Sequence, residues 1–240
     1  MSKFVPRSLL LLLVFLWAGI AAAENFDSEV ASIILLQIKA VQKELGVTEL
    51  QRAAMNKFAD AHRARLGDYY KKVEKAGGTP DEQKLLVMFR EMKKGVLSQM
   101  SPAQIKRLRE ISLQTLDFVA LSDKTVGAKV GLSPSQLAQI GDIVKLAEER
   151  ADGIRDDAVK KATDGQHHSS PKSKQEYDSM IKDRSQRVNA AIKSILPQVE
   201  SIRAESKKQV MDILTPDQKA KWQALLGSPF RGLNGSLGSR

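Results

Sequence analysis

Hydrophobic residues recur at spacings of three and four along most of this chain, which is the period of a helix with one buried face. The clearest run lies between residues 137 and 158, where the steps alternate between three and four as in a heptad seam. The run consists of Leu137, Ile140, Val144, Ala147, Ala151, Ile154 and Ala158. The alternation of apolar and polar residues that is typical of strands is rare. The pattern therefore predicts an all-α protein built of elongated helical hairpins.

Glycine, proline and capping residues indicate where the helices begin and end. Gly46 and the glycine pair at 77–78 follow two of the periodic runs, and the polar stretch 164–171 predicts a loop. Pro197 lies inside a later run and is expected to kink or break that helix, because it removes a backbone hydrogen bond. The predicted helices cover residues 28–45, 48–76, 80–96, 101–119, 123–130, 133–158, 177–213 and 215–225.

One five-residue pattern, an apolar residue followed by Ser or Thr and then Gln three positions later, occurs four times. Its Ser or Thr and Gln pairs are Thr48 with Gln51, Ser101 with Gln104, Ser133 with Gln136, and Thr215 with Gln218. Each pair predicts a capping box, in which two side chains satisfy backbone N–H groups at a helix start. A related box with Glu instead of Gln is predicted at 79–82. Capping accounts for any single copy, but a glutamine in all four is harder to assign to capping alone.

The spacing of these motifs predicts an internal duplication. Residues 45–51 align with 130–136 at an offset of 85, and residues 91–104 align with 205–218 at an offset of 114. Chance similarity between helices rich in Lys and Glu is the alternative. The predicted units cover residues 24–121 and 122–226, and the difference of 29 residues between the offsets gives the second unit a longer hairpin. Residues 227–240 are rich in Gly and Ser and are predicted to be a disordered tail.

The first 23 residues have the features of a secretory signal peptide. Lys3 and Arg7 form a basic start, a short apolar run follows, and three alanines at 21–23 form a cleavage site. The alternative is an uncleaved N-terminal anchor. Cleavage would leave 217 residues with no stable membrane span, in the periplasm or secreted. The sequence contains no cysteine, so helix packing and not disulfides is expected to stabilise it.

The net charge of +10 falls to +8 without Lys3 and Arg7, which favours acidic or unfolded protein clients as partners. Nucleic acid is not expected, because export and few aromatic residues both argue against it. The candidate client-binding residues are basic and lie on one predicted helix: Arg63, Arg65, Lys71 and Lys72. A further basic cluster lies at residues 106–109. Ordinary helix solubility is the alternative explanation for each cluster.

Residues suited to catalysis or metal binding are few. The histidines are His62, expected on the surface, and the pair His167 and His168, expected in the solvated loop. A metal site needs three or four converging ligands, and the sequence shows no such set. It also has no cysteine nucleophile and no glycine-rich phosphate loop. We therefore predict a protein that is not an enzyme, with no catalytic residue, cofactor or assigned metal ligand.

The second unit resembles the Spy/CpxP-like family of periplasmic proteins. The motifs that carry the resemblance are residues 132–136 and 213–219, together with the signal segment and the absence of cysteine. The resemblance implies a helical hairpin that pairs with a second copy into a curved cradle. Because this chain has two such units, it implies either a dimer or an intrachain pseudo-dimer.

The resemblance also implies a function class. Members act as ATP-independent chaperones, as envelope-stress modulators or as metal-responsive proteins. We therefore expect an exported, non-enzymatic helical binding protein with a chaperone-like or envelope-stress role. The alternatives are a metal-responsive periplasmic protein and a structural helical scaffold.

Overall fold

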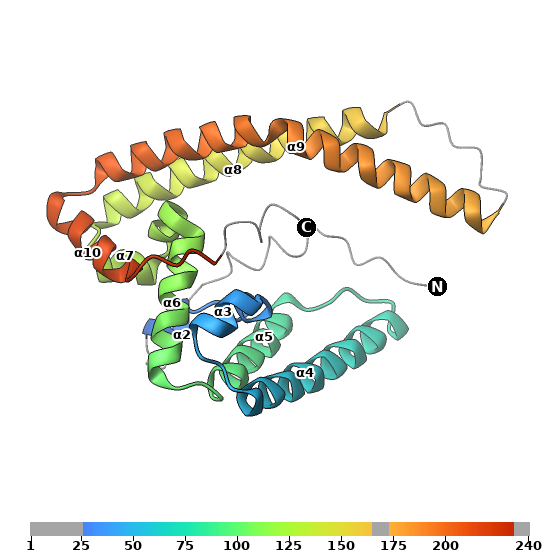
Figure 1. Ribbon diagram of the computed structural model, residues 1–240, viewed down its shortest axis with the longest axis horizontal. Coiled ribbons are helices and arrows are strands. Elements are labelled where there is room, and N and C mark those ends of the chain that lie inside the picture. Colours follow the sequence, from blue (N-terminus) through green and yellow to red (C-terminus); the bar gives the residue numbers. More distant parts are fainter. Residues whose placement is uncertain (1–25, 165–172, 233–240) are drawn as a thin grey trace. The chain divides into compact units, whose positions relative to one another are not determined.

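A computed structural model describes residues 26–164 and 173–232, and every regular element in these ranges is a helix (Figure 1). This confirms the all-α prediction. The chain divides into two compact units, one formed by Met1–Asp117 with Gln223–Arg240 and the other by Phe118–Trp222. The predicted boundary at residue 121 is thus four residues late. The last residues of the chain also belong to the first unit, which no sequence pattern indicated.

Unit 1 begins with three short helices where a single helix was predicted over 28–45. Extended backbone at Ser32 and Ile38 interrupts it. The run at 33–36 is apolar on every side, so a continuous helix would leave part of it in water. The interruptions let Leu35 and Leu36 both enter the core, while the Ser32 N–H donates to Ser112 Oγ at 2.8 Å. The elements are α2 (Phe26–Val30), η1 (Ile33–Gln37) and α3 (Lys39–Glu44).

The rest of unit 1 is a hairpin of α4 (Glu49–Lys75) and α5 (Glu82–Leu97), followed by α6 (Pro102–Leu116). The capping box predicted at 79–82 is wrong, because Asp81 caps α5 by accepting from the N–H groups of Gln83 and Lys84. Residues of η1, α3, α5 and α6 form one core, which includes Val41, Leu108 and Ile111. The outer part of the hairpin has few buried side chains, because only two helices meet there.

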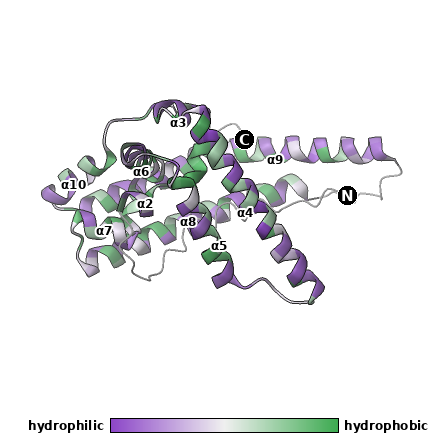
Figure 2. Cartoon of the chain, turned by 90° about the horizontal axis from the view of Figure 1, so that it is seen from below, coloured by the Kyte–Doolittle hydropathy of each residue, from purple (hydrophilic) through white to green (hydrophobic). Residues whose placement is uncertain are grey.

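Unit 2 is dominated by a second, longer hairpin. It contains η2 (Asp117–Ser122), α7 (Lys124–Val130), α8 (Pro134–Thr163), α9 (Lys174–Ile213) and the start of α10 (Pro216–Leu226). Helices α8 and α9 lie side by side along the hairpin (Figure 1). Figure 2 shows hydrophobic and hydrophilic residues alternating in bands along α9. The buried side chains of α8 and α9 all lie near the base of the hairpin: Ile140, Val144, Ile202, Ser206 and Val210.

Two expectations about the C-terminal half are corrected. Of the kink or break expected at Pro197, the break is wrong, because α9 continues as one helix through this residue. Pro197 lies on the exposed side, where water can bond to the carbonyl group that its ring leaves unpaired. The predicted disordered tail is wrong for residues 227–232, which are held against α6. Residues 233–240 and the predicted signal peptide lie outside the described residues.

Candidate functional site

All four predicted capping boxes form, and their glutamines also bind one another. In unit 1 the amides of Gln51 and Gln104 form a reciprocal pair, with Nε2 to Oε1 distances of 2.9 and 3.1 Å. Gln51 Nε2 also donates to the Gln99 carbonyl at 3.0 Å, and Gln104 Nε2 to the Leu45 carbonyl at 3.1 Å. We call this arrangement the glutamine clasp. It joins the starts of α4 and α6 and so closes the base of the first hairpin.

Unit 2 contains a second glutamine clasp. Gln136 and Gln218 exchange two amide hydrogen bonds of 2.9 Å. Gln136 Nε2 also donates to the Ile213 carbonyl at 3.0 Å, and Gln218 Nε2 to the Gly131 carbonyl at 2.8 Å. Both amides keep their capping bonds to the backbone N–H groups of Ser133 and Thr215. Glutamate cannot replace them, because an ionised carboxylate has no proton to donate.

The predicted client-binding residues lie on α4, and three of the four are paired with acids. Arg63 Nη1 is 2.7 Å from Asp60 and Lys71 Nζ is 3.4 Å from Asp68, both within the helix. Arg65 bridges to Glu91 of α5 at 3.0 Å. Lys72 is exposed. The structure therefore places the four residues along one exposed helix, with most of their charge compensated locally.

His62 contradicts the expectation of a surface residue, because it is only 4% exposed. It lies between α4 and α5 with its ring centroid 5.9 Å from that of Phe89, and its buried Nε2 has no hydrogen-bond partner. Burial lowers the pKa of His62 below its usual value of 6.5, and Arg65 lowers it further, whereas Glu91 opposes the shift. Its place on the apolar side of α4, seven residues after Met55, was the signal that sequence reasoning missed.

The α4–α5 hairpin should lose stability in acid. The folded pKa of His62 lies below the unfolded value of about 6.5, so the unfolded state binds more protons as the pH falls below that value. The stabilisation is full above about pH 6.5 and declines as the pH falls towards the folded pKa. Hydrogen exchange, corrected for intrinsic rates, should show weaker protection of α4 and α5 near pH 5 than at pH 7.5.

The variant His62→Phe should remove this pH dependence while keeping a ring against Phe89. Helices α8 and α9 serve as the internal control, because they contain no histidine. An equal loss of protection in both hairpins, or a pH dependence that persists in the variant, would contradict the role given to His62.

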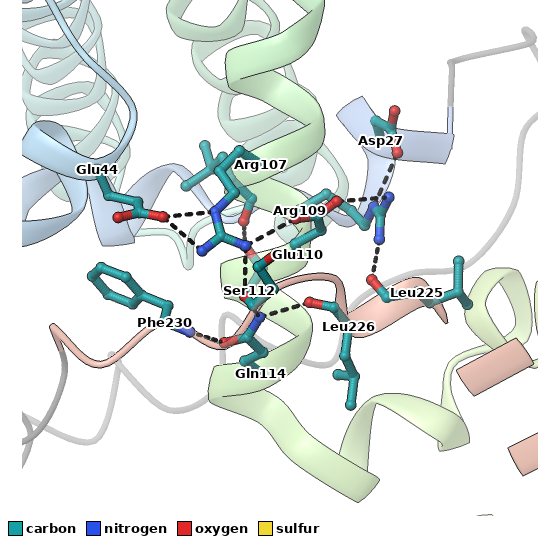
Figure 3. Close-up of polar contacts among 12 residues, drawn as sticks. Asp27, Glu44, Arg107, Arg109, Glu110, Ser112, Gln114, Leu225, Leu226 and Phe230 are labelled. Carbon is teal, nitrogen blue, oxygen red and sulfur yellow. Dashed lines mark hydrogen bonds and ion pairs between the residues drawn. The ribbon is translucent and has the colours of Figure 1, made fainter. Parts of the chain in front are cut away.

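The basic cluster at 106–109 is not an open binding surface, because its two arginines are engaged in unit 1 (Figure 3). Arg107 bridges to Glu44 at 2.6 Å and to Glu110 at 2.9 Å, and its Nη1 donates to the Ser228 carbonyl at 2.7 Å. Arg109 has a side chain only 6% exposed; it bridges to Asp27 at 3.0 Å and donates to the Leu225 carbonyl. The charge of each guanidinium is therefore compensated by neighbouring carboxylates.

Gln114, near the end of α6, completes this network (Figure 3). Its Nε2 donates to the carbonyls of Leu226 at 2.6 Å and Ser228 at 2.8 Å, and its Oε1 accepts from the Phe230 N–H at 2.7 Å. Three side chains of α6, those of Arg107, Arg109 and Gln114, thus hold the main chain at 225–230. Sequence reasoning missed this site, because no local pattern links residues more than a hundred positions apart.

A shallow groove runs along the distal part of the α8–α9 hairpin, with a volume of about 690 Å³. Its apolar wall includes Ile154, Ala158, Ala190, Ala191 and Ile195. None of the residues 145–164 and 173–201 is fully buried. These two ranges contain ten basic and ten acidic residues, so that part of the hairpin has no net charge.

Within residues 26–164 and 173–232, no three His, Cys, Asp or Glu side chains are grouped closely enough to hold a metal ion. His167 and His168 lie outside these ranges. No helix in the described part of the chain combines the length and the apolar character that crossing a membrane requires.

No protein-family model, curated protein or solved structure matches the chain.

Proposed function

We propose that this chain is an exported, non-enzymatic helical binding protein with a chaperone-like role in envelope stress. The observation that carries the proposal is the distal α8–α9 hairpin, where no residue of 145–164 or 173–201 is fully buried and several apolar side chains are exposed. Leu146, Tyr177 and Leu196 are 57%, 49% and 42% exposed. None of these three residues lines the groove, whose half-buried wall includes Ile154 and Ile195, and contiguous apolar surface of that kind marks interaction sites in soluble proteins.

The charge pattern narrows the class of client. An acidic client would need an excess of basic residues around the groove, yet the distal hairpin is electrically balanced. Alternating charges beside half-buried apolar residues suit segments of unfolded chain, which carry both signs and expose side chains that folding would bury. Unfolded polypeptide is therefore the client that we propose for this surface.

The repeated glutamine clasp supports a duplicated origin for the two hairpins. The clasp acceptors Gln99 and Ile213 are 114 positions apart, and the glutamines Gln51 and Gln136 are 85 apart. These are the offsets at which the sequences align. We infer that both hairpins descend from one unit, in which the clasp closed the base and left the distal arms free for binding.

An aggregation assay tests the proposed function. The chain from residue 24 onward should suppress aggregation of a chemically unfolded model protein when present in several-fold excess. The double variant Ile154→Lys, Ile195→Lys should lose most of this activity, because it places two charges on the apolar wall of the groove.

The matched control is Leu50→Lys, which adds a charge at an apolar residue that is 84% exposed on α4. Circular dichroism should show the same helix content in all three proteins. Failure of the unaltered chain to suppress aggregation, or equal losses in the groove variant and the control, would refute the proposal.

A further inference from the structure

Residues 227–232 occupy unit 1 much as a bound peptide would. They follow α10 without regular structure, and the side chains of Arg107 and Gln114 bind their main-chain atoms (Figure 3). The carbonyl of Ser228 receives two of these bonds and the N–H of Phe230 donates a third. Because main-chain atoms are common to every sequence, recognition of this kind tolerates many different side chains.

The side chains of this segment contribute one apolar anchor and little else. Ser228, Pro229 and Arg231 are exposed, whereas Phe230 is partly buried against the apolar core of unit 1. Gly227 has a φ of +63°, and a Cβ there would overlap the Glu110 carboxylate. A segment with so little buried side-chain surface opens at low free energy compared with the helices around it.

We propose that the groove along α6, formed by Arg107, Gln114 and the apolar contact surface of Phe230, binds an extended segment of unfolded polypeptide. Residues 227–232 are its resident occupant, and a client segment with one aromatic or aliphatic anchor displaces them. The groove requires no acidic ligand, because Glu44 and Glu110 already compensate the charge of Arg107. The class of client rests on the proposed function, whereas the existence of the groove does not.

The covalent link between residues 227–232 and α10 explains why the α6 groove would be covered when no client is bound. The segment is joined to α10, so its effective concentration at the groove is on the order of millimolar. A free peptide must compete with that concentration. Unseating the segment without altering the groove should therefore strengthen peptide binding by about tenfold or more.

The test uses the full chain from residue 24 and a fluorescent peptide with the sequence of residues 225–232. In the variant Gly227→Ala, Phe230→Ala, which we call the unseated variant, the added Cβ meets Glu110 and the anchor is lost. Fluorescence anisotropy should show that the unseated variant binds the peptide about tenfold more tightly than the unaltered chain. The control Ser228→Ala keeps the carbonyl that is bound and should leave peptide affinity unchanged.

Two further measurements identify the groove and the ligand. In the unseated variant, Gln114→Ala should weaken peptide binding about tenfold, because it removes three main-chain contacts. Lys106→Ala, at an exposed position of the same helix, should leave peptide binding unchanged. An unrelated peptide of the same length with one phenylalanine should bind as well, and the same peptide with alanine in its place should not.

The outcomes separate this inference from the proposed function. The proposed α6 groove would be refuted if the unaltered chain and the unseated variant bound the peptide with equal affinity. It would also be refuted if peptide binding were insensitive to Gln114→Ala. If the groove bound the peptide of residues 225–232 but not the unrelated peptide with one phenylalanine, the proposal that it binds unfolded clients would be refuted. If the peptides bind as expected but the chain does not suppress aggregation, the α6 groove is supported and the chaperone-like function is refuted. If Gln114→Ala lowers the helix content, Gln114→Glu, which keeps only the acceptor, replaces it.

Discussion

Replacing Arg109 by alanine is expected to lower the free energy of unfolding of unit 1 by about 3 kcal/mol, as for other broken buried ion pairs. Arg109 bridges to Asp27 at 3.0 Å and donates to the Leu225 carbonyl. Its guanidinium also lies 5.5 Å from the centre of the Phe26 ring. The substitution removes all three contacts and leaves Asp27, whose side chain is 24% exposed, without this partner. Helix α2 and the end of α10 would then each lose a contact with α6, whereas the bond from Gln114 to the Leu226 carbonyl would remain.

Hydrogen exchange is the suitable measurement, because it reports each unit separately. Protection should fall in α2 and α6 and remain unchanged in α8 and α9. Arg109→Lys should have an intermediate effect, since an ammonium group keeps the charge but lacks the planar fork that reaches two acceptors. Lys106→Ala, which removes one positive charge from an exposed neighbour, is the matched control. Similar losses in Lys106→Ala and Arg109→Ala would mean that net charge, and not the buried contacts, determines the effect.

Replacing Gln218 by alanine is expected to destabilise unit 2 by about 3 kcal/mol, at roughly 1 kcal/mol or less for each lost bond. Gln218 is only 8% exposed and accepts from the Thr215 N–H at 3.0 Å. It also donates to the Gly131 carbonyl and exchanges two bonds with Gln136. The substitution therefore removes the glutamine half of a capping box and a clasp together, while Thr215 Oγ1 still accepts from the N–H of residue 218. Loss of the bond to the Thr215 N–H alone would cost about 1 kcal/mol or less.

Denaturant unfolding followed by Trp222 fluorescence measures this effect, because Trp222 is 1% exposed and lies one turn from Gln218. Gln218→Glu should destabilise unit 2 at neutral pH at least as much as Gln218→Ala. A carboxylate preserves the cap but places a negative charge against the Gly131 carbonyl. Gln223→Ala, at an exposed position of α10, should change the stability by less than about 0.5 kcal/mol. If Gln218→Glu proved as stable as the unaltered chain, the clasp would contribute nothing beyond capping.

The sequence was sufficient to place the starts of α4, α6, α8 and α10, because a capping box is local. Thr48 and Gln51 are three residues apart, and the hydrogen bonds between them depend on little else. The constant glutamine could be noticed in the sequence but not explained by it. Its explanation is a partner 53 positions away in unit 1 and 82 positions away in unit 2. Spacing along a helix carries no information about such contacts.

The predictions from sequence that proved wrong also failed because of contacts between distant residues. Ser32 and Ile38 leave the helical conformation because the core of unit 1 has room for apolar residues on more than one face of this run. Arg109 looked like a solvated basic residue, because its buried acceptors lie 82 and 116 positions away. Residues 227–230 had the composition of a disordered tail, yet α6 supplies hydrogen-bond donors and acceptors for their main chain. In each case tertiary contacts outweighed local preference.

The interrupted path of unit 1 has a consequence for how the protein is made. The chain leaves this unit at Asp117 and returns to it at Gln223. The side chains of Arg109 and Gln114 each have a main-chain partner 116 positions ahead of them. At a synthesis rate of about 5–20 residues per second, that interval lasts on the order of ten seconds. During this interval α2–α6 are already synthesised but the residues that will cover α6 are not. Every newly made molecule therefore passes through a stage in which the first unit is open, and residues 225–230 close it only after α7–α9 have been synthesised.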